Sequence, residues 1–266
     1  MFSNWIKIEK TIFKNIPMIF NISKKEFVKE FAGSKLGVLW AIIRPLAMIM
    51  VFWFVFTKFK IADTGKFPYI IWLIAGYIPW LFISDNITVG AGSIRNHSYL
   101  VKKVKFPVEI LPSIRLLINF YTYSILLIVS FIIFGMYGFL GQINFLLLLY
   151  YTLATVIFMS ATIRLLSSWV VMSIDVQHGV GVIIQFLFWM TPVMWDPKNY
   201  SNLIVSLLKL NPLYYLITGF RDSYLGFGIQ TEAIQYHAYF WVFTILLLIL
   251  SSNVFARLRP EFDDVL

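Results

Sequence analysis

The stretch Leu116–Ile163 decides the fold, because it carries no charged side chain: LLINFYTYSILLIVSFIIFGMYGFLGQINFLLLLYYTLATVIFMSATI. A helix needs about 20 apolar residues to cross about 30 Å of hydrocarbon, so the stretch is long enough for two membrane spans. Turn-forming residues lie near its middle, namely Gly138, Gly141, Gln142 and Asn144. The sequence therefore predicts a pair of transmembrane helices, because lipid cannot satisfy the edge of a strand.

The composition extends this interpretation to the whole chain of 266 residues. Apolar residues make up 59% and charged residues 13%, whereas a soluble domain has about 45–50% apolar and about 25% charged residues. The 26 Phe, 14 Tyr and 9 Trp exclude intrinsic disorder, and the absence of cysteine excludes disulfide scaffolds and thiolate–metal sites. The net charge of +9 fits basic cytoplasmic loops better than it fits nucleic-acid binding.

Further apolar stretches complete an all-α membrane protein with six transmembrane helices in a single domain over residues 1–266. Residues 1–35 are expected to be cytoplasmic or interfacial, and the expected spans are about 36–57, 67–90, 112–137, 145–167, 176–195 and 234–256. An inside N-terminus leaves most Lys and Arg in cytoplasmic segments, so the positive-inside rule predicts that both termini are cytoplasmic. The basic residues left outside are Lys58, Lys60, Lys66, Lys198, Lys209 and Arg221.

Two kinds of non-spanning helix are also expected. An amphipathic helix that starts near a capping box of Ser23 and Glu26 precedes the first span and lies in the membrane interface, unless it is an ordinary solvated helix. Its apolar face contains Ile16, Phe20, Phe27 and Phe31. Nearer the C-terminus, the apolar segments 203–208 and 213–220 are too short to span, and they predict two re-entrant helices in the outer leaflet.

The basic loop 94–112 contains an apolar rib of Leu100, Val101 and Val104, which share one face of a short helix. A solvated loop has little need of such a rib, whereas the groove of a partner protein would bind it. The alternative is that the rib packs on lipid headgroups.

Two charged residues, Arg44 and Asp85, lie inside expected spans at similar depths near the inner ends. Ionisable groups inside a membrane are costly and often functional. We therefore hypothesise an intramembrane Arg44–Asp85 ion pair that joins the first two spans. The alternative is that Arg44 snorkels to the interface while Asp85 lies in interfacial water.

The residues available for chemistry are few. His97, His178 and His237 are scattered, no metal-ligand cluster is evident, and no glycine-rich phosphate loop precedes a Lys-Ser or Lys-Thr pair. Aromatic side chains are plentiful and either line a path for a glycan, since aromatic faces stack on sugar rings, or face lipid. The candidates for a channel or gate are Trp53, Trp72, Tyr77, Trp80, Phe186 and Trp189.

Several motifs follow one another along the chain in a recognisable order. The first two expected spans contain Leu36-Gly37-Val38-Leu39-Trp40, Arg44-Pro45-Leu46 and Ala75-Gly76-Tyr77-Ile78-Pro79-Trp80-Leu81-Phe82. The later segments are Val104-Lys105-Phe106-Pro107-Val108-Glu109-Ile110-Leu111-Pro112, Thr191-Pro192-Val193, Asn211-Pro212 and Leu258-Arg259-Pro260-Glu261-Phe262-Asp263-Asp264-Val265-Leu266. Together these motifs resemble the ABC-2 type permeases that export polysaccharides. The family often has an Arg-Asp pair before span five, where this chain has Ser173-Ile174-Asp175.

The resemblance implies a homodimer in the bacterial cytoplasmic membrane, with each subunit on a separate ATPase subunit in a 2+2 complex. ATP and Mg²⁺ would bind to the ATPase, so this chain would be a permease without enzymatic activity and without a bound cofactor or metal. The substrate would be a lipid-linked glycan of the undecaprenyl type, such as teichoic acid, O-antigen or capsule. The interfacial helix would be about 23–33, the gate would lie between spans one and five, and the ATPase-coupling helix would comprise Ser98, Tyr99, Leu100, Val101, Lys102, Lys103, Val104 and Lys105.

The alternatives to polysaccharide export are an ABC-2 exporter of a small lipid or drug, an integral-membrane enzyme acting on lipid-linked sugars, and a non-enzymatic assembly factor. The enzyme would need an acidic or histidine cluster at one membrane interface.

Overall fold

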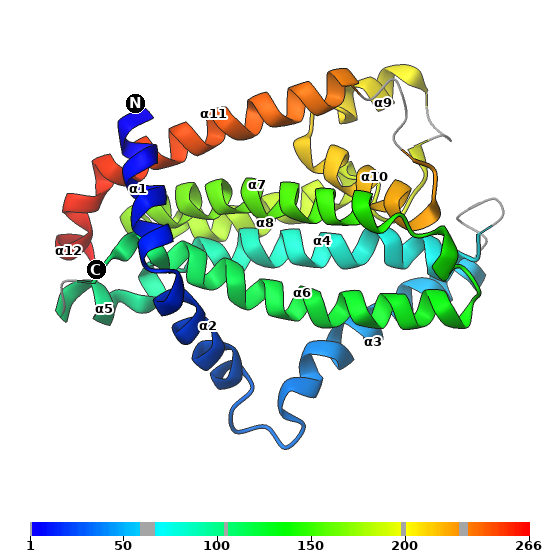
Figure 1. Cartoon of the computed structure of the whole chain (residues 1–266), viewed down its shortest axis with the longest axis horizontal. Coiled ribbons are helices and arrows are strands. Elements are labelled where there is room, and N and C mark those ends of the chain that lie inside the picture. Colours follow the sequence, from blue (N-terminus) through cyan, green and yellow to red (C-terminus); the bar gives the residue numbers. More distant parts are fainter. Residues whose placement is uncertain (1, 59–66, 104–105, 198–200, 229–233) are drawn as a thin grey trace.

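The computed structural model describes residues 2–58, 67–103, 106–197, 201–228 and 234–266, and the regular structure in these ranges is helical (Figure 1). Five helices in the described ranges are long and apolar enough to cross a membrane. They are Gly37–Lys58, Tyr69–Ala91, Val108–Met136, Phe145–Met172 and Ile234–Val265. The prediction of an all-α fold with long apolar helices is therefore confirmed.

The long helices run along the molecule and define its two ends (Figure 1). They are α3 (Trp40–Lys58), α4 (Tyr69–Ala91), α6 (Leu111–Met136), α7 (Phe145–Met172) and α11 (Ile234–Leu258). The short helices α5 (Ser98–Lys103) and α12 (Phe262–Val265) lie at one end, here named the α5 end, together with both chain termini. Helix α9 (Asn202–Leu208) lies at the opposite end, here named the α9 end.

The expected span at 176–195 forms a helix that is shorter than predicted. Helix α8 (Asp175–Met190) has 16 residues, or about 24 Å at 1.5 Å per residue, which is less than the hydrocarbon thickness. It stops because Thr191 precedes Pro192 and adopts an extended backbone, the conformation that a following proline favours. Five helices of spanning length are thus present in the described residues, and a sixth crossing depends on α8.

Helix α4 forms the centre of the bundle. Over the 18 most apolar consecutive residues of α4, 78% are buried, compared with 11% over the corresponding 18 residues of the span that contains α3. A helix that is apolar on all sides belongs in a core, and α4 contacts α3, α6, α7, α8 and α10. Close packing depends on Gly90, where a Cβ atom would approach the side chain of Ile163 within 2.9 Å. Helix α3 is peripheral and exposes Met50, Val51 and Phe54.

The N-terminal helices cross the α5 end of the bundle (Figure 1). They are α1 (Phe2–Lys14), which the sequence did not predict, and α2 (Ile16–Glu30), separated at Asn15. The predicted capping box is wrong, because Ser23 lies within α2 and donates a hydrogen bond to the carbonyl oxygen of Phe20.

The predicted apolar face of α2 is only partly correct. Ile16 and Phe20 are exposed, whereas Phe27 packs on Tyr121 of α6 with ring centroids 5.5 Å apart. Ile19 and Ser23 are buried, and the Ser23 and Tyr121 hydroxyls hydrogen-bond at 3.2 Å. Packing against α6 therefore selects a face that includes a small polar residue, which an apolar pattern does not identify.

A separate hydrophobic core lies at the α5 end and joins segments from both halves of the chain. Its buried members come from α1, α2, α5, α6, α7, α11, α12 and the segments beside them. They are Ile8, Ile19, Ile94, Val101, Val108, Ile110, Leu111, Ile114, Ile118, Val171, Phe255 and Phe262. The C-terminal tail is therefore part of this core, where Phe262 packs edge-on against Phe255.

At the α9 end, the predicted pair of short helices between Asp196 and Glu232 is confirmed as α9 and α10 (Pro212–Leu225). Asn211 caps α10 by accepting a hydrogen bond from the backbone N–H of Leu213 at 3.0 Å. Gly226 ends the helix with a φ of 70°, a conformation that glycine adopts without strain. Helix α10 packs against α4 and α7 and therefore joins the core of the bundle.

Candidate functional site

The segment predicted to couple to a partner is anchored to the bundle before α5 begins. Arg95 lies in the 3₁₀ turn Arg95–His97, and its guanidinium donates to the carbonyl oxygens of Val170 and Val171, both at 3.4 Å. His97 hydrogen-bonds through Nδ1 to the Ser93 carbonyl oxygen at 2.8 Å, and its Nε2 lies 3.9 Å from the Glu26 carboxylate. The coupling segment therefore contacts both α7 and α2.

The two faces of α5 have different environments. Val101 is buried in the core of the α5 end, and Leu100 packs beside it. Tyr99 is 53% exposed and Lys102 is exposed. The rib was predicted to bind a partner, and for Val101 that interpretation is wrong, because the protein's own core buries this side chain. Val104 and Lys105 lie outside the described residues, as does the side chain of Lys103.

The structure does not bring Arg44 and Asp85 together as an ion pair. The guanidinium of Arg44 lies 5.6 Å from the ring centroid of Trp40 on the same peripheral helix. The charged groups that act on Asp85 are Arg115 and Glu30. The hypothesis is therefore wrong, because equal depth along two helices does not determine whether their side chains face each other.

A chain of polar side chains extends from α2 through α6 to α4. Glu30 forms an ion pair with Arg115, and Arg115 donates through Nη2 to Oδ1 of Asn119 at 2.7 Å. Asn119 donates to Oδ1 of Asn86 at 3.0 Å, and both amides are buried. This network of polar side chains was not predicted from the sequence, although the two asparagines in otherwise apolar spans were a visible signal. The chain fixes α2 to two central helices.

A second buried polar cluster fixes α1 to the bundle. Arg164 of α7 is 2% exposed and donates to the Glu9 carboxylate of α1 and to the Ser252 hydroxyl of α11, each at 2.7 Å. Nearby, Asn4 donates to Asn253 at 3.0 Å. A buried arginine requires such partners, and here they come from two helices, α1 and α11, that are distant from α7 in sequence.

The predicted channel or gate aromatics separate into two groups. Trp72, Tyr77 and Trp80 of α4 are buried in the main core, whereas Trp53, Phe186 and Trp189 on α3 and α8 are exposed. Two further aromatics connect the groups. Phe52 packs 5.4 Å from Tyr77 and 6.3 Å from Phe188, and Phe188 packs 5.5 Å from Trp80. These centroid distances show an aromatic seam between α3, α4 and α8, and α3 and α8 correspond to the expected spans one and five.

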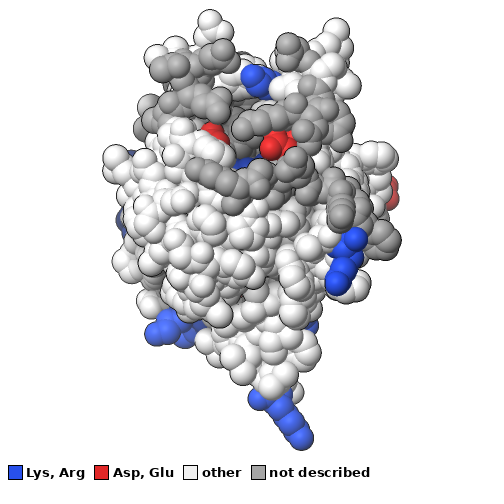
Figure 2. All heavy atoms as spheres, turned by 90° about the vertical axis from the view of Figure 1, so that its right-hand side faces the viewer, with Lys and Arg blue, Asp and Glu red and all other residues white. Residues whose placement is uncertain are grey.

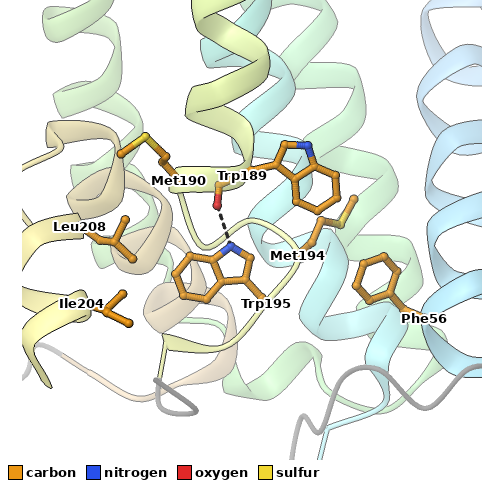
Figure 3. Close-up of a pocket in the computed structure, with 7 residues that line it drawn as sticks. All are labelled: Phe56, Trp189, Met190, Met194, Trp195, Ile204 and Leu208. Atoms are coloured by element: carbon orange, nitrogen blue, oxygen red, sulfur yellow. Dashed lines mark hydrogen bonds between the residues drawn. The ribbon is translucent and has the colours of Figure 1, made fainter. Parts of the chain in front are cut away.

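An open apolar pocket of about 440 Å³ lies at the α9 end of this seam (Figure 3). Its walls come from α3, the end of α8, the turn after α8, and α9. The indole N–H of Trp195 donates to the Trp189 carbonyl oxygen at 3.0 Å and so fixes one wall. The lining residues are Phe56, Trp189, Met190, Met194, Trp195, Ile204 and Leu208. Such a lining suits an aliphatic chain, since methionine and tryptophan offer large apolar surfaces.

Arg221 of α10 holds the turn beside this pocket, a role that the sequence analysis did not assign. Its guanidinium carbon lies 3.6 Å from the ring centroid of Trp72, and Nη2 donates to the Val193 carbonyl oxygen at 3.1 Å. Asp196 and Asp222 act on it electrostatically. Figure 2, which looks onto the α9 end, shows acidic and basic side chains inside a hollow. Arg221 therefore joins α10, α4 and the turn after α8.

Relatives of the chain are named as export permeases or as a transport protein. The first is the O-antigen export system permease protein RfbA of Myxococcus xanthus, 24% identical over 97% of this chain and 99% of the relative. The RfbA protein of Klebsiella pneumoniae is 22% identical over 98% of this chain and 99% of the relative. The polysialic acid transport protein KpsM of Escherichia coli is 23% identical over 84% and 87% of the two chains.

A family model agrees with these relatives. The model described as "ABC-2 type transporter" matches residues 18–225, which include α3, α4, α5 and α10. The matched region thus contains the aromatic seam, the coupling segment and the pocket. The chain belongs to the ABC-2 type transporter family.

Proposed function

We propose that this chain is the transmembrane subunit of an ATP-driven exporter of a lipid-linked polysaccharide in the bacterial cytoplasmic membrane. The observation that carries the proposal is the match over nearly the whole chain to permeases named for O-antigen export. The relatives favour a polysaccharide over a drug or small lipid, and they favour a permease over an enzyme or an assembly factor. The complex would contain two copies of this chain and two separate ATPase subunits, which would bind ATP and Mg²⁺.

The proposed orientation places the α5 end, with both termini, in the cytoplasm. Helix α8 would be the sixth crossing. Because it is shorter than the hydrocarbon thickness, local thinning of the bilayer and the turn after α8 would cover the remaining distance. Helices α9 and α10 would be re-entrant from the outside, since α10 packs against α4 and α7 inside the bundle and Arg221 of α10 donates there to the Val193 carbonyl oxygen. The positive-inside distribution of Lys and Arg supports this orientation.

The contacts of α5 suggest how ATP-driven motion would reach the gate. A displacement of α5 would act on α7 through Arg95 and on α2 through the His97–Glu26 contact. Helix α2 is fixed to α6 by the Glu30–Arg115 pair and through Asn119 to Asn86 of α4, and residues 31–39 connect it to α3. A ligand shifts such an equilibrium only if it binds one state preferentially, so ATP on the partner must favour one arrangement of these helices.

The seam between α3 and α8 would admit the lipid-linked end of the substrate. The exposed Trp53, Phe186 and Trp189 would face either the lipid or the glycan, and the pocket at the α9 end would receive part of an aliphatic chain. The chain's own contribution is positioning, because ATP hydrolysis would take place on the partner.

The coupling surface gives the test of this proposal. Substituting the exposed pair Tyr99→Ala and Lys102→Glu should weaken association with the ATPase subunit by about tenfold or more, because truncating central interface residues commonly costs over about 1 kcal/mol. Thermal stability should be unchanged, since neither side chain belongs to the core. Co-purification and ATP hydrolysis in lipid nanodiscs would measure both effects.

A matched control lies far from the coupling segment. Tyr137→Ala with Lys58→Glu changes an exposed tyrosine and an exposed lysine near the α9 end. This variant should bind the ATPase as the unsubstituted permease does. If the Tyr99→Ala and Lys102→Glu variant binds the ATPase as tightly as the unsubstituted permease, the coupling surface lies elsewhere. If the unsubstituted permease binds no ATPase at all, the proposed function is contradicted.

A further inference from the structure

Helix α1 has three distinct faces, and one of them is apolar and exposed. Phe2, Ile6 and Phe13 are 60%, 60% and 69% exposed. At 3.6 residues per turn their directions fall within about 40° of one another, so they form one stripe. An exposed apolar stripe on a helix that is too short to span indicates a surface with a partner.

The second face of α1 is basic. Lys7, Lys10 and Lys14 are all exposed and follow the apolar stripe around the helix. The acidic residue of α1, Glu9, is paired with Arg164 and therefore does not neutralise these lysines. An apolar stripe beside a lysine stripe is the pattern of a helix that lies on an anionic membrane surface.

The third face holds α1 in place independently of any lipid. Ile8 is buried in the core of the α5 end, and the Glu9–Arg164 pair is 2.7 Å long. Asn4 donates to Asn253 of α11 at 3.0 Å. With this face fixed, the orientation of the apolar and basic stripes is also fixed.

The contacts of α1 with α11 place it at the edge of the apolar region. Asn4 of α1 contacts α11 directly at Asn253, and Arg164 of α7 bridges Glu9 of α1 to Ser252 of α11. At 1.5 Å per residue, these positions lie about 4 Å beyond the exposed Leu250 and about 7 Å before Arg257. Leu250 fits the hydrocarbon and Arg257 fits the aqueous phase, so α1 crosses at the depth of the headgroups.

We propose that α1 is a binding surface for anionic phospholipid in the cytoplasmic leaflet. The side chains of Phe2, Ile6 and Phe13 enter the boundary of the acyl chains, and the lysine ammonium groups bind lipid phosphates. The surface rests on the proposed orientation, with the α5 end in the cytoplasm. Because Glu9 on the same helix pairs with the buried Arg164, lipid bound at α1 also stabilises the contact of α1 with α7 and α11.

The chain contains no cysteine, so single labels are straightforward. The full permease, assembled with its ATPase subunit in nanodiscs, would carry an environment-sensitive fluorophore at Phe13→Cys or at Ser3→Cys on the lysine side. Brominated phosphatidylcholine with phosphatidylglycerol should quench the label at position 13 more strongly than the label at position 3. Little difference between the two positions would contradict the proposed burial of the apolar stripe.

Charge is tested separately by comparing Lys7→Glu, Lys10→Glu and Lys14→Glu, made together, with the three matched Lys→Arg changes. Adding phosphatidylglycerol should increase the quenching at position 13. This increase should fall at least about threefold in the Glu variant and persist in the Arg variant. Equal quenching with and without phosphatidylglycerol would overturn the anionic specificity. If the ATPase subunit, and not lipid, shields the label at position 13, α1 is not a lipid-binding surface. Normal assembly with the ATPase in the same experiment would still support the proposed function.

Discussion

Glu9→Ala is expected to destabilise the permease by about 3 kcal/mol or more, because it leaves Arg164 buried without its carboxylate partner. Arg164 is 2% exposed, and among the described residues its other side-chain hydrogen bond is to the Ser252 hydroxyl at 2.7 Å. A hydroxyl does not balance a buried guanidinium charge. Thermal unfolding of the purified permease in detergent would measure the loss.

The matched control for this prediction is an exposed ion pair. Asp263→Ala removes the Arg259–Asp263 contact, which is 3.6 Å long with a half-exposed carboxylate, and should cost less than about 1 kcal/mol. The double variant Glu9→Ala with Arg164→Met should be more stable than the sum of the two single changes predicts, because it removes both charges. If Glu9→Ala lowers the free energy of unfolding as little as Asp263→Ala does, other groups must stabilise the buried charge of Arg164.

Gly219→Ala should also destabilise the fold strongly. A Cβ atom at this position in α10 would overlap the ring of Tyr151 in α7. Tyr151 cannot move away easily, since it is 5% exposed and packs against Tyr215 and Phe220, with centroids 5.4 and 6.1 Å away. Overpacking of this kind costs about 1–3 kcal/mol or more, because α10 must separate from α7. The same thermal unfolding assay would report it.

Gly179→Ala is the control for the glycine prediction. Gly179 also lies in a helix, but a Cβ atom there meets no other atom within 4 Å. Its substitution should therefore be neutral or slightly stabilising, as alanine is the better helix former. If Gly219→Ala and Gly179→Ala unfold at the same temperature, the close approach of α10 to α7 is not required for stability.

The helices that depend on hydropathy along the chain could be predicted from the sequence. The contacts that depend on the direction of individual side chains could not. The charge-free stretch at 116–163 does form α6 and α7, and the apolar segments after Asp196 do form α9 and α10. These predictions succeed because lipid and backbone hydrogen bonding permit few alternatives.

Where one side chain has several potential partners, its actual contact could not be predicted from the sequence. Arg44 and Asp85 were expected at similar depths, yet α3 is peripheral and the charged groups that act on Asp85 are Arg115 of α6 and Glu30 of α2. Val101 has the same apolar character whether it binds an ATPase or the protein's own C-terminal tail. The Glu9–Arg164 pair joins residues 155 positions apart, and no local pattern reports such a separation.

The central claim is that this chain moves a lipid-linked polysaccharide when a separate ATPase acts on α5. The most direct test reconstitutes permease and ATPase in proteoliposomes, with the ATPase outside and a labelled lipid-linked O-antigen in the outer leaflet. ATP should drive delivery of the glycan to the interior, and this delivery should be abolished by Tyr99→Ala with Lys102→Glu and unaffected by Tyr137→Ala with Lys58→Glu. Glycan that stays outside despite an assembled, ATP-hydrolysing complex, or that enters equally without ATP, would contradict it.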